Sequence, residues 1–233
     1  ARYEENSNYS SDPIQTYNVS MFRNIPLINV QATGTLKTGF RVPTLYEESN
    51  KSADLAPETS KTYEVSLAKT IQQAVVKVTY FDTYLDNKIG YDFTTWTYAN
   101  IEKSTQQGVE YAVDIAEIGG LSFLTLAYSD IQSYDNNQRA IRVPDYKATL
   151  TAGIEHNNWT YGAYMIHEGD KLDVGSEVLS SYTYVDLKTR YAYDDVTSLF
   201  VKIHNVFNEQ YETAAGFNEQ NRTVYVGIKR FFN

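Results

Sequence analysis

Hydrophobic and polar residues alternate with a period of two along most of the chain, and the helical period is nearly absent. Between Tyr184 and Tyr193, for example, Asp186, Lys188 and Arg190 occupy every second position, and mostly apolar residues lie between them. Successive side chains of a β-strand point to opposite faces of the sheet, so this pattern predicts strands with one apolar and one charged face. Three charges on one face cannot point into a dry core. We therefore expect an antiparallel sheet whose charged face is wet.

The connections between the predicted strands are of two kinds. Tight turns are expected around Asn24–Pro26, Thr70–Gln73, Glu117–Gly120, His156–Asn158 and Asp194–Val196. Long polar loops are expected at Arg41–Ser60, Asp86–Asn100, Ser133–Arg142, His167–Leu179 and Asn208–Asn221. The strands between them run to about 10 residues or more, whereas strands of soluble proteins run to about 5 to 6. Short turns at one end and long loops at the other are typical of an up-and-down transmembrane β-barrel, and they disfavour a soluble β-sandwich or propeller.

The barrel prediction assigns each alternating set of side chains to one environment. The set expected to face lipid comprises Val109, Tyr111, Val113, Val185, Leu187, Tyr191, Leu199, Val201 and Ile203. The set expected to face the lumen comprises Glu110, Asp114, Asp186, Lys188, Arg190 and Lys202. Tyrosine is used 21 times, and tyrosine rings form aromatic girdles at membrane interfaces. We expect two girdles, built from Tyr80, Tyr84, Tyr128, Trp159, Tyr161, Tyr191 and Tyr193.

The number of predicted strands bears on the extent of the barrel. We count about eleven antiparallel strands, with Ala1–Tyr3 as the end of another, whereas bacterial single-chain barrels close with an even number. Either one strand is miscounted or the chain is part of a larger barrel that lacks its N-terminal part. No linker or change of composition divides residues 1–233, which predicts a single domain or part of one. The N-terminus resembles neither a signal peptide nor the start of a natural chain.

Charge and residue usage argue against several classes of function. The chain has 20 basic and 29 acidic side chains and a net charge of −9, which argues against nucleic acid as a partner. Because it has no cysteine, it has no disulfides, thiolate nucleophiles or Cys-based zinc or iron–sulfur sites. No window approaches about 18 uninterrupted apolar residues, so no transmembrane helix is expected. Nothing in the sequence predicts a bound cofactor.

Catalysis and metal binding both lack a specific residue pattern. The histidines His156, His167 and His204 fall in a turn, a loop and a strand end, without a metal-ligand spacing or a Ser and Asp partner. We therefore expect no enzyme and assign no catalytic residue. The polar loop segments Asp135–Asn137 and Asp170–Asp173 could bind Ca²⁺, but acidic loop residues are more often simply solvated, and we assign no metal site.

Several segments resemble, in their order and spacing, the motifs of TonB-dependent outer-membrane receptors. They are Gly39–Glu48 (GFRVPTLYEE), Ala53–Glu64 (ADLAPETSKTYE), Tyr98–Glu110 (YANI at its start, QGVE at its end), Tyr184–Leu187 (YVDL) and Asn205–Tyr211 (NVFNEQY). Each also has an architectural explanation, such as strand capping by Asn205 or a loop backbone fixed at Pro43 and Pro57. We expect most of these motifs to touch no substrate. The resemblance implies a barrel of about 22 strands around an N-terminal plug.

Within that family, the segment Tyr211–Ile228 looks most like the cobalamin receptors. Two positions depart from the pattern, because Asn221 stands before Arg222 where Gly is usual, and Asn233 follows the aromatic Phe232. The resemblance implies active import of a scarce, bulky ligand, with cobalamin as the first expectation and a ferric siderophore or haem as the alternative. A passive porin-like channel and an outer-membrane hydrolase are the remaining rivals.

The resemblance also implies a location and partners. The chain would lie in the outer membrane of a Gram-negative bacterium, in contact with outer-membrane lipid, and would bind a small-molecule ligand, cobalamin or an iron chelate. It would engage TonB through an N-terminal part that this sequence does not contain. Residues 1–233 would then be the C-terminal part of the receptor barrel, with the plug and the first half of the barrel absent. Alone, such a chain would not transport.

A ligand site follows from the same resemblance. In the cobalamin-receptor branch, an Arg pair that opens the strand after one long loop contacts the ligand. The nearest match here ends at Arg142, which is the first candidate, and Arg139 is the second. Tyr134, across the same loop, offers an aromatic surface for a corrin-sized ring. An Arg can donate several hydrogen bonds to amide or phosphate oxygens. The alternative is that Arg142 pairs with a lumen carboxylate such as Asp114 or Asp186.

Overall fold

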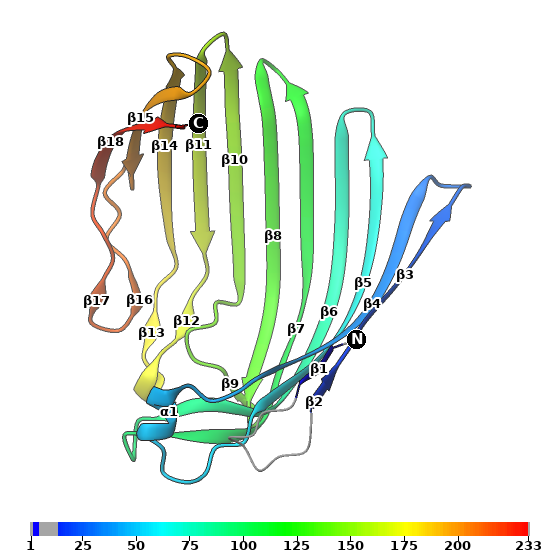
Figure 1. Ribbon diagram of the computed structural model, residues 1–233, viewed down its shortest axis with the longest axis vertical. Coiled ribbons are helices and arrows are strands. Elements are labelled where there is room, and N and C mark those ends of the chain that lie inside the picture. Colours follow the sequence, from blue (N-terminus) through cyan, green and yellow to red (C-terminus); the bar gives the residue numbers. More distant parts are fainter. Residues whose placement is uncertain (1, 5–13, 233) are drawn as a thin grey trace. The chain divides into compact units, whose positions relative to one another are not determined.

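Most of the chain forms β-strands in a computed structural model, which describes residues 2–4 and 14–232 (Figure 1). The longer strands are β3 (Asn18–Ile25), β4 (Val30–Arg41), β5 (Glu58–Ile71), β6 (Ala74–Asp92), β7 (Thr97–Ile118), β8 (Leu121–Asp135), β10 (Tyr146–His156), β11 (Trp159–Glu168), β14 (Tyr182–Ala192), β15 (Thr197–His204) and β18 (Thr223–Arg230). The short ones are β1 (Arg2–Glu4), β2 (Ile14–Thr16), β9 (Gln138–Arg139), β12 (Lys171–Leu172), β13 (Val178–Leu179), β16 (Glu212–Ala214) and β17 (Phe217–Asn218). Helix α1 spans Leu45–Ser49, and a 3₁₀ turn spans Val174–Ser176.

The longer strands form one sheet in the order β18-β15-β14-β11-β10-β8-β7-β6-β5-β4-β3, and β9 joins it beside β8. Successive long strands are neighbours in the sheet throughout, which is up-and-down topology. This confirms the predicted all-β antiparallel fold and the count of about eleven strands. The order ends at β3 and β18, so the described strands form an open sheet rather than a closed barrel. Among the described residues, no helix is long and apolar enough to span a membrane.

The chain divides into two compact units. The first contains the described residues up to Leu67 together with Thr79–Val109 and Ile131–Ala140. The second contains Ala68–Val78, Glu110–Asp130 and the described residues from Ile141 onward. Strands β5 to β8 contribute to both units. The hairpin β3–β4 belongs to the first unit, and the hairpins β10–β11 and β14–β15 belong to the second.

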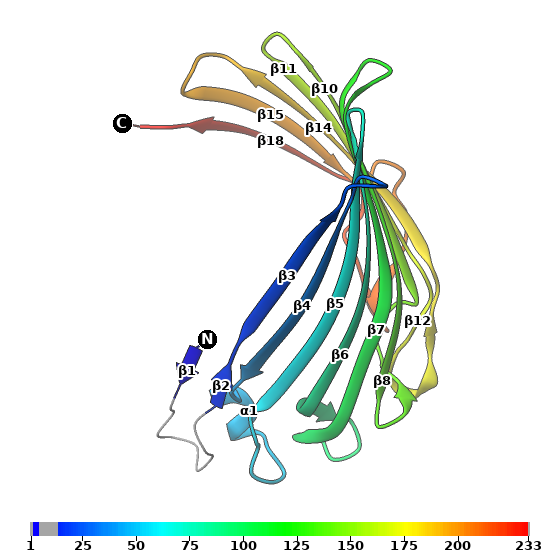
Figure 2. The ribbon, with the colours of Figure 1, turned by 90° about the vertical axis from the view of Figure 1, so that its right-hand side faces the viewer.

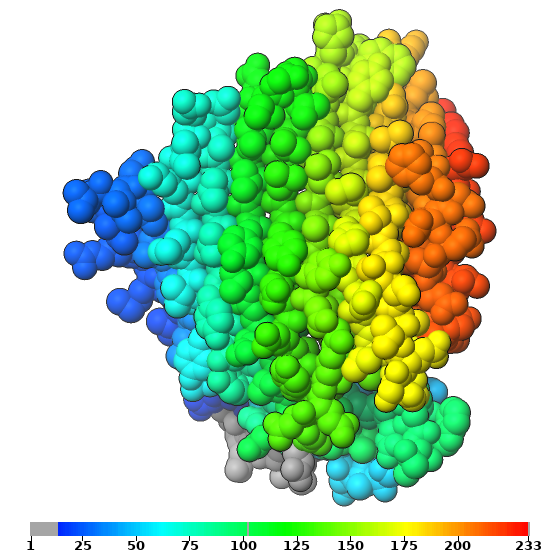
Figure 3. All heavy atoms as spheres, turned by 180° about the vertical axis from the view of Figure 1, so that it is seen from behind, coloured from blue at the N-terminus to red at the C-terminus, as the bar shows by residue number. Residues whose placement is uncertain are grey.

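In the second unit, the strand register separates the two predicted sets of side chains. Leu187 of β14 pairs with Ile203 of β15, and Lys188 pairs with Lys202, so apolar residues share one face and charged residues the other. The register continues into β11, where Ala163 lies opposite Leu187. We call these the apolar face and the polar face. Figures 1 and 2 show β10, β11, β14 and β15 side by side, and Figure 3 shows them as adjacent bands from yellow-green to orange.

Aromatic side chains of the apolar face gather in two groups. Near the tight turns, the ring centre of Trp159 lies 4.7 Å from that of Tyr191 and 5.8 Å from that of Tyr161. Toward the long loops, the rings of Tyr128 and Tyr146 stack with centres 6.3 Å apart. Of the predicted girdle residues in the strands of the second unit, three lie in the first group and Tyr128 lies in the second, and their placement at two membrane interfaces stays a prediction. Tyr80 and Tyr84 belong to the first unit, and Tyr193 lies in the turn after β14.

The two aromatic groups lie eight residues apart along β10. Tyr128 pairs with Ala148, and Trp159 pairs with His156. From residue 148 to residue 156 a strand rises about 27 Å, or about 20 Å along the membrane normal if it is tilted by about 40°. The residues of β10 that face the apolar side between these positions are Leu150, Ala152 and Ile154. The apolar band of the second unit is therefore about 20 Å high between the two groups, somewhat less than the band of about 25 Å on a typical outer-membrane barrel.

Two predicted loops prove to be continuations of strands. β6 runs to Asp92 and β7 begins at Thr97, so the expected loop Asp86–Asn100 is a tight turn between long strands. β8 similarly runs to Asp135 and returns at once through β9, where a loop to Arg142 was expected. The polar residues that indicated loops are satisfied between strands, since the Lys88 ammonium donates to the Asp135 carboxylate at 2.8 Å. Polar side chains did not mark the ends of these strands, because the backbone hydrogen bonds between strands form equally well where the side chains are solvated.

Two smaller expectations also change. His167 lies within β11 rather than in a loop, because that strand continues to Glu168. The N-terminal residues do not extend the main sheet, since β1 pairs with β2 in a separate two-stranded sheet. Ala1 and Asn233, on which two of the expectations fell, lie outside the described residues.

Candidate ligand-binding site

The first two sequence motifs meet at Arg41 in the first unit. The Arg41 guanidinium donates to Glu47 at 2.9 Å and to Glu58 at 2.7 Å. Glu47 also closes the N-terminus of α1, because its carboxylate accepts the Thr44 N–H while the Thr44 hydroxyl accepts the Glu47 N–H. Burial alone would raise the pKa of Glu47, but hydrogen bonds from Arg41 and Thr44 lower it below its ordinary value. Glu58 additionally accepts the Ile89 N–H. These charges thus hold the loop before β5 in place.

The third motif is tied to the second through Asn100. The Asn100 side chain accepts the Ala56 N–H at 2.8 Å and donates to the Ala56 carbonyl at 3.0 Å. It also donates to the carbonyl oxygen of Asn87 at 2.7 Å. Asn87 has a φ of 55°, a left-handed conformation that Asn tolerates better than most residues. The motif residues of the first unit therefore bind one another.

The fourth and fifth motifs meet in the second unit. The Asp186 carboxylate accepts from Lys202 and His204, each at 2.8 Å, and from the Asn205 N–H at 3.0 Å. Asn205 is fully buried and has a φ of 50°. Its side chain donates to the Glu209 carbonyl and accepts the Glu209 N–H, both within 2.9 Å. The expected capping of the strand by Asn205 is confirmed, and this cap opens the loop between β15 and β16.

At the loop end of the second unit, the Asp173 carboxylate joins three loop segments. One oxygen, Oδ1, accepts from Arg142 Nε and from the Val174 N–H, each at 2.8 Å. The other, Oδ2, accepts the Ala215 N–H at 2.6 Å. The Arg142 N–H in turn donates to the Leu172 carbonyl at 2.6 Å. We call this set of hydrogen bonds around Asp173 the Asp173 clasp.

The environment of the clasp favours an ionised carboxylate. The Asp173 side chain is 0% exposed, whereas that of Arg142 is 44% exposed. Burial alone would raise the pKa of Asp173, but hydrogen bonds from Ala215, Arg142 and Val174 lower it below its ordinary value. A buried carboxylate without these donors would be strongly destabilising. The three segments are therefore held together as long as Asp173 is charged.

Three tyrosine rings stack beside the clasp, on the polar face of β14. The ring of Tyr211, from the loop after β15, lies over those of Tyr182 and Tyr184, with centres 4.1 and 5.5 Å away and planes within 22° of parallel. Tyr182 is nearly buried, and the Lys171 ammonium lies 5.5 Å from its ring centre. Burial raises the pKa of Tyr211 to about 12, which keeps its hydroxyl neutral. These rings give the loop end of the polar face a flat aromatic surface.

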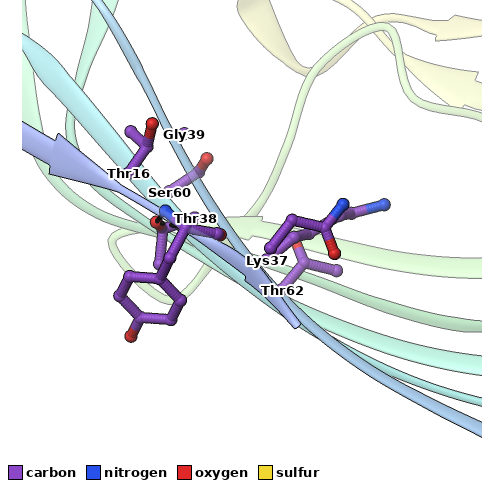
Figure 4. A pocket seen from close by; sticks show the side chains of 8 residues that line it. Thr16, Lys37, Thr38, Gly39, Ser60 and Thr62 are labelled. Carbon is purple, nitrogen blue, oxygen red and sulfur yellow. Dashed lines mark hydrogen bonds between the residues drawn. The ribbon is translucent and has the colours of Figure 1, made fainter. Parts of the chain in front are cut away.

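The cavities formed by the described residues include one between the loops of the second unit and one in the first unit. A cavity of about 330 Å³ lies between the loops of the second unit and is lined by Glu177, Val178, Leu179, Ser180, Ser181, Gln210, Tyr211, Glu212 and Asn218. A cavity of about 510 Å³ in the first unit is lined by Thr16, Tyr17, Asn18, Lys37, Thr38, Gly39, Ser60 and Thr62 (Figure 4). The charged group of the latter, Lys37, is already paired with Glu64. The cavity between the loops of the second unit, which includes the stacked Tyr211, is therefore a better candidate for ligand contact than the cavity of the first unit.

The structure distributes the predicted site residues over both units. Tyr134 and Arg139 belong to the first, where they pair across the β8–β9 turn. Tyr134 adjoins Asp135 in the strand, so the two side chains point to opposite faces. Arg142 belongs to the second unit. Arg142 does pair with a carboxylate, as one alternative predicted, but the partner is Asp173 rather than Asp114 or Asp186. The Asp114 carboxylate accepts a hydrogen bond from Thr125. The Asp186 carboxylate accepts from Lys202 and His204.

Sequence reasoning missed the clasp and the tyrosine stack for different reasons. Asp173 entered only as a loop carboxylate that could bind Ca²⁺, and no pattern linked it to Arg142. The sequence could have placed Tyr182 and Tyr184 on the polar face, because they lie four and two residues before Asp186 in the same strand and every second side chain points to the same face. Among the described residues, no group of three or more His, Asp or Glu side chains could hold a metal ion. His167 contacts Thr183 and Tyr146 and belongs to no catalytic arrangement that we recognise.

Comparison with known proteins identifies the family. Residues 1–206 match the family model described as TonB dependent receptor-like, beta-barrel. The chain belongs to this family. As a member of the TonB-dependent receptor family it is an outer-membrane β-barrel sequence. Its relatives are transporters and receptors rather than enzymes.

Several known proteins resemble this TonB-dependent receptor chain. The vitamin B12 transporter BtuB of Vibrio cholerae serotype O1 is 26% identical over 238 residues, which cover 97% of this chain and 38% of that protein. BtuB of Photobacterium profundum is 25% identical over 96% of this chain and 38% of its own length. Our chain thus spans 38% of the length of these curated relatives.

Solved structures share the fold at lower identity. The copper transporter OprC has a TM-score of 0.76 and 13% identity, over 95% of this chain and 40% of that one. The siderophore receptor PirA from Acinetobacter baumannii has a TM-score of 0.74 and 16% identity, over 95% of this chain and 41% of that one. At such identities these likenesses establish the barrel fold and nothing about the ligand.

Proposed function

We propose that residues 1–233 form the C-terminal part of the barrel of an active outer-membrane transporter whose ligand is cobalamin. The observation that carries this proposal is the likeness to vitamin B12 transporters along 97% of the chain. The plug, the remaining strands and the segment that engages TonB would come from parts of the receptor outside this sequence. A small-molecule ligand and outer-membrane lipid are the partners that the barrel itself would contact.

The ligand would approach the loop end of the second unit and contact Arg142. The Asp173 clasp supports this role, because it uses the Nε of Arg142 while the side chain remains 44% exposed. The terminal guanidinium nitrogens can donate to the amide or phosphate oxygens of a corrinoid. Arg139 and Tyr134, which belong to the first unit, are proposed separately as further ligand contacts from the β8–β9 turn.

Equilibrium binding of cyanocobalamin to the complete receptor in outer-membrane vesicles tests this proposal. Replacing both Arg142 and Arg139 by Ala should weaken binding by about 1 to 3 kcal/mol, or about 5- to 150-fold, because charge-assisted hydrogen bonds are lost. Arg190→Ala is the matched control, since Arg190 lies on the polar face near the tight turns. It should leave the affinity unchanged.

The outcomes separate the two levels of the proposal. Unchanged affinity in the Arg142 and Arg139 double variant would remove the site assignment. Tight binding of a ferric siderophore or haem, without binding of cyanocobalamin, would replace cobalamin by that second candidate and keep the transporter. Passive, TonB-independent diffusion of small solutes through the complete protein would instead favour a porin-like channel.

A further inference from the structure

The Asp173 clasp connects segments that are distant in the sequence and lie in different loops of the second unit. Arg142 precedes β10, Asp173 lies between β12 and the 3₁₀ turn, and Ala215 lies in the turn of the β16–β17 hairpin. The hydrogen bonds span 31 residues from Arg142 to Asp173 and 42 residues from Asp173 to Ala215. One buried carboxylate therefore fixes the relative positions of three loops at the end of the sheet where ligand would enter.

Arg142 is held at two points, which leaves its terminal nitrogens for another partner. Its N–H is bound to the Leu172 carbonyl and its Nε to Asp173, and its backbone φ of 61° fixes the direction in which the side chain leaves the chain. Within the described residues, Arg142 donates through its backbone N–H and its Nε, and neither terminal nitrogen takes part in these bonds. An exposed Arg loses side-chain entropy when a ligand immobilises it, and one that is already held loses less.

We propose that Asp173 is a positioning residue for ligand binding, which orients Arg142 toward the ligand and couples that orientation to the loop that carries Ala215. This inference rests on the proposed function, because it requires that Arg142 contact the ligand. Asp173 itself is enclosed and contacts no ligand. The rival explanation is that Asp173 holds the loops together without acting through Arg142.

A double-mutant cycle in the complete receptor distinguishes these explanations, with the dissociation constant of cyanocobalamin as the readout. Asp173→Ala should weaken binding about 10-fold when Arg142 is present and less than about 2-fold in the Arg142→Ala background, because the two residues act as a unit. Asp173→Asn keeps the size of the side chain and should shift affinity in the same direction if the Ala variant does not fold. Glu155→Gln, which changes an exposed carboxylate at the tight-turn end of β10, is the matched control and should change nothing.

Hydrogen exchange at the Ala215 amide reports the clasp without any ligand. Protection of this amide should fall in the Asp173 variants and persist in Arg142→Ala, since Ala215 donates to the oxygen that Arg142 does not use. Equal loss of affinity from Asp173→Ala in both backgrounds would overturn the positioning role while leaving the ligand assignment intact. Full protection of Ala215 in Asp173→Ala would overturn the clasp. A wild-type receptor without affinity for cyanocobalamin would overturn the proposed ligand and, with it, this inference.

Discussion

The assignment of the apolar face to lipid predicts that a single charge will be costly at one residue and tolerated at the next. Ala152 lies on the apolar face of β10, between Leu124 of β8 and Ala163 of β11. Thr151 lies on the polar face, between Thr125 and Tyr164. Both positions are in the interior of the sheet and share the same backbone ladder. Replacing each by Arg therefore changes the environment of the charge and little else.

The expected magnitude follows from the position of Ala152 between the two aromatic groups. Residue 152 is midway between residues 148 and 156, or about 13 Å along the strand from each group and about 10 Å along the membrane normal. At that depth an Arg on the lipid face costs about 2 to 4 kcal/mol. On the polar face the guanidinium remains hydrated, so Thr151→Arg should cost less than about 1 kcal/mol. The predicted difference between the two variants is thus about 2 kcal/mol or more.

Reversible unfolding of the complete receptor by guanidinium in phosphatidylcholine vesicles measures both costs. Ala152→Met controls for the added volume at an apolar site and should leave the free energy of unfolding within about 1 kcal/mol of the wild type. Equal costs for Ala152→Arg and Thr151→Arg would refute the assignment of the apolar face to lipid. A larger cost for Thr151→Arg would reverse it and indicate that the charged face is the one packed against an apolar medium.

Two further predictions concern close packing and pH. Gly153→Ala should cost about 1 to 3 kcal/mol in the same unfolding assay, because its Cβ would clash with Cζ of Phe123 and would lie 2.9 Å from the carbonyl oxygen of Tyr161. Its cross-strand partner Gly162 has no atom within 3.9 Å of an added Cβ, so Gly162→Ala should be neutral or slightly stabilising, and equal costs would contradict the packing argument. Because the pKa of Asp173 is lowered in the folded protein, the clasp is at full strength above about pH 4 and weakens as the pH falls through that lowered value. The protection factor of the Ala215 amide should therefore be the same at pH 7 and pH 5, and a loss between those values would be inconsistent with an ionised clasp.

Much of the sheet could be predicted from the sequence because the information is local. Alternation of apolar and charged residues assigns the faces of β14 and β15 residue by residue, and the register of Leu187 with Ile203 agrees with it. The tight turns were found for the same reason, since residues such as Asn157 and Gly119 adopt the positive φ values that such turns need. The motif series likewise indicated the family, and its residues proved to bind one another.

The pattern of apolar and polar residues did not predict where the strands end. Residues such as Lys88 and Asp135 indicated loops because they are charged, yet Lys88 of β6 pairs with Asp135 of β8 across the intervening strand β7. A membrane strand needs apolar side chains on one face only within the bilayer, and beyond it any solvated residue can continue the ladder. Hydropathy therefore marks where the membrane stops rather than where the strand stops.

The sequence by itself determined the strands, their two faces, the tight turns and the family, because each depends on neighbours a few residues apart. The tertiary structure decided which carboxylate holds Arg142. The two nearest predicted candidates, Asp114 and Asp186, are engaged by Thr125 and by Lys202 with His204, and Asp173 takes the role from 31 residues away. Loops have no periodicity, so the contacts among them depend on where the sheet register brings their ends. The contacts between these loops therefore depend on the folded chain as a whole, and no local residue pattern predicts them.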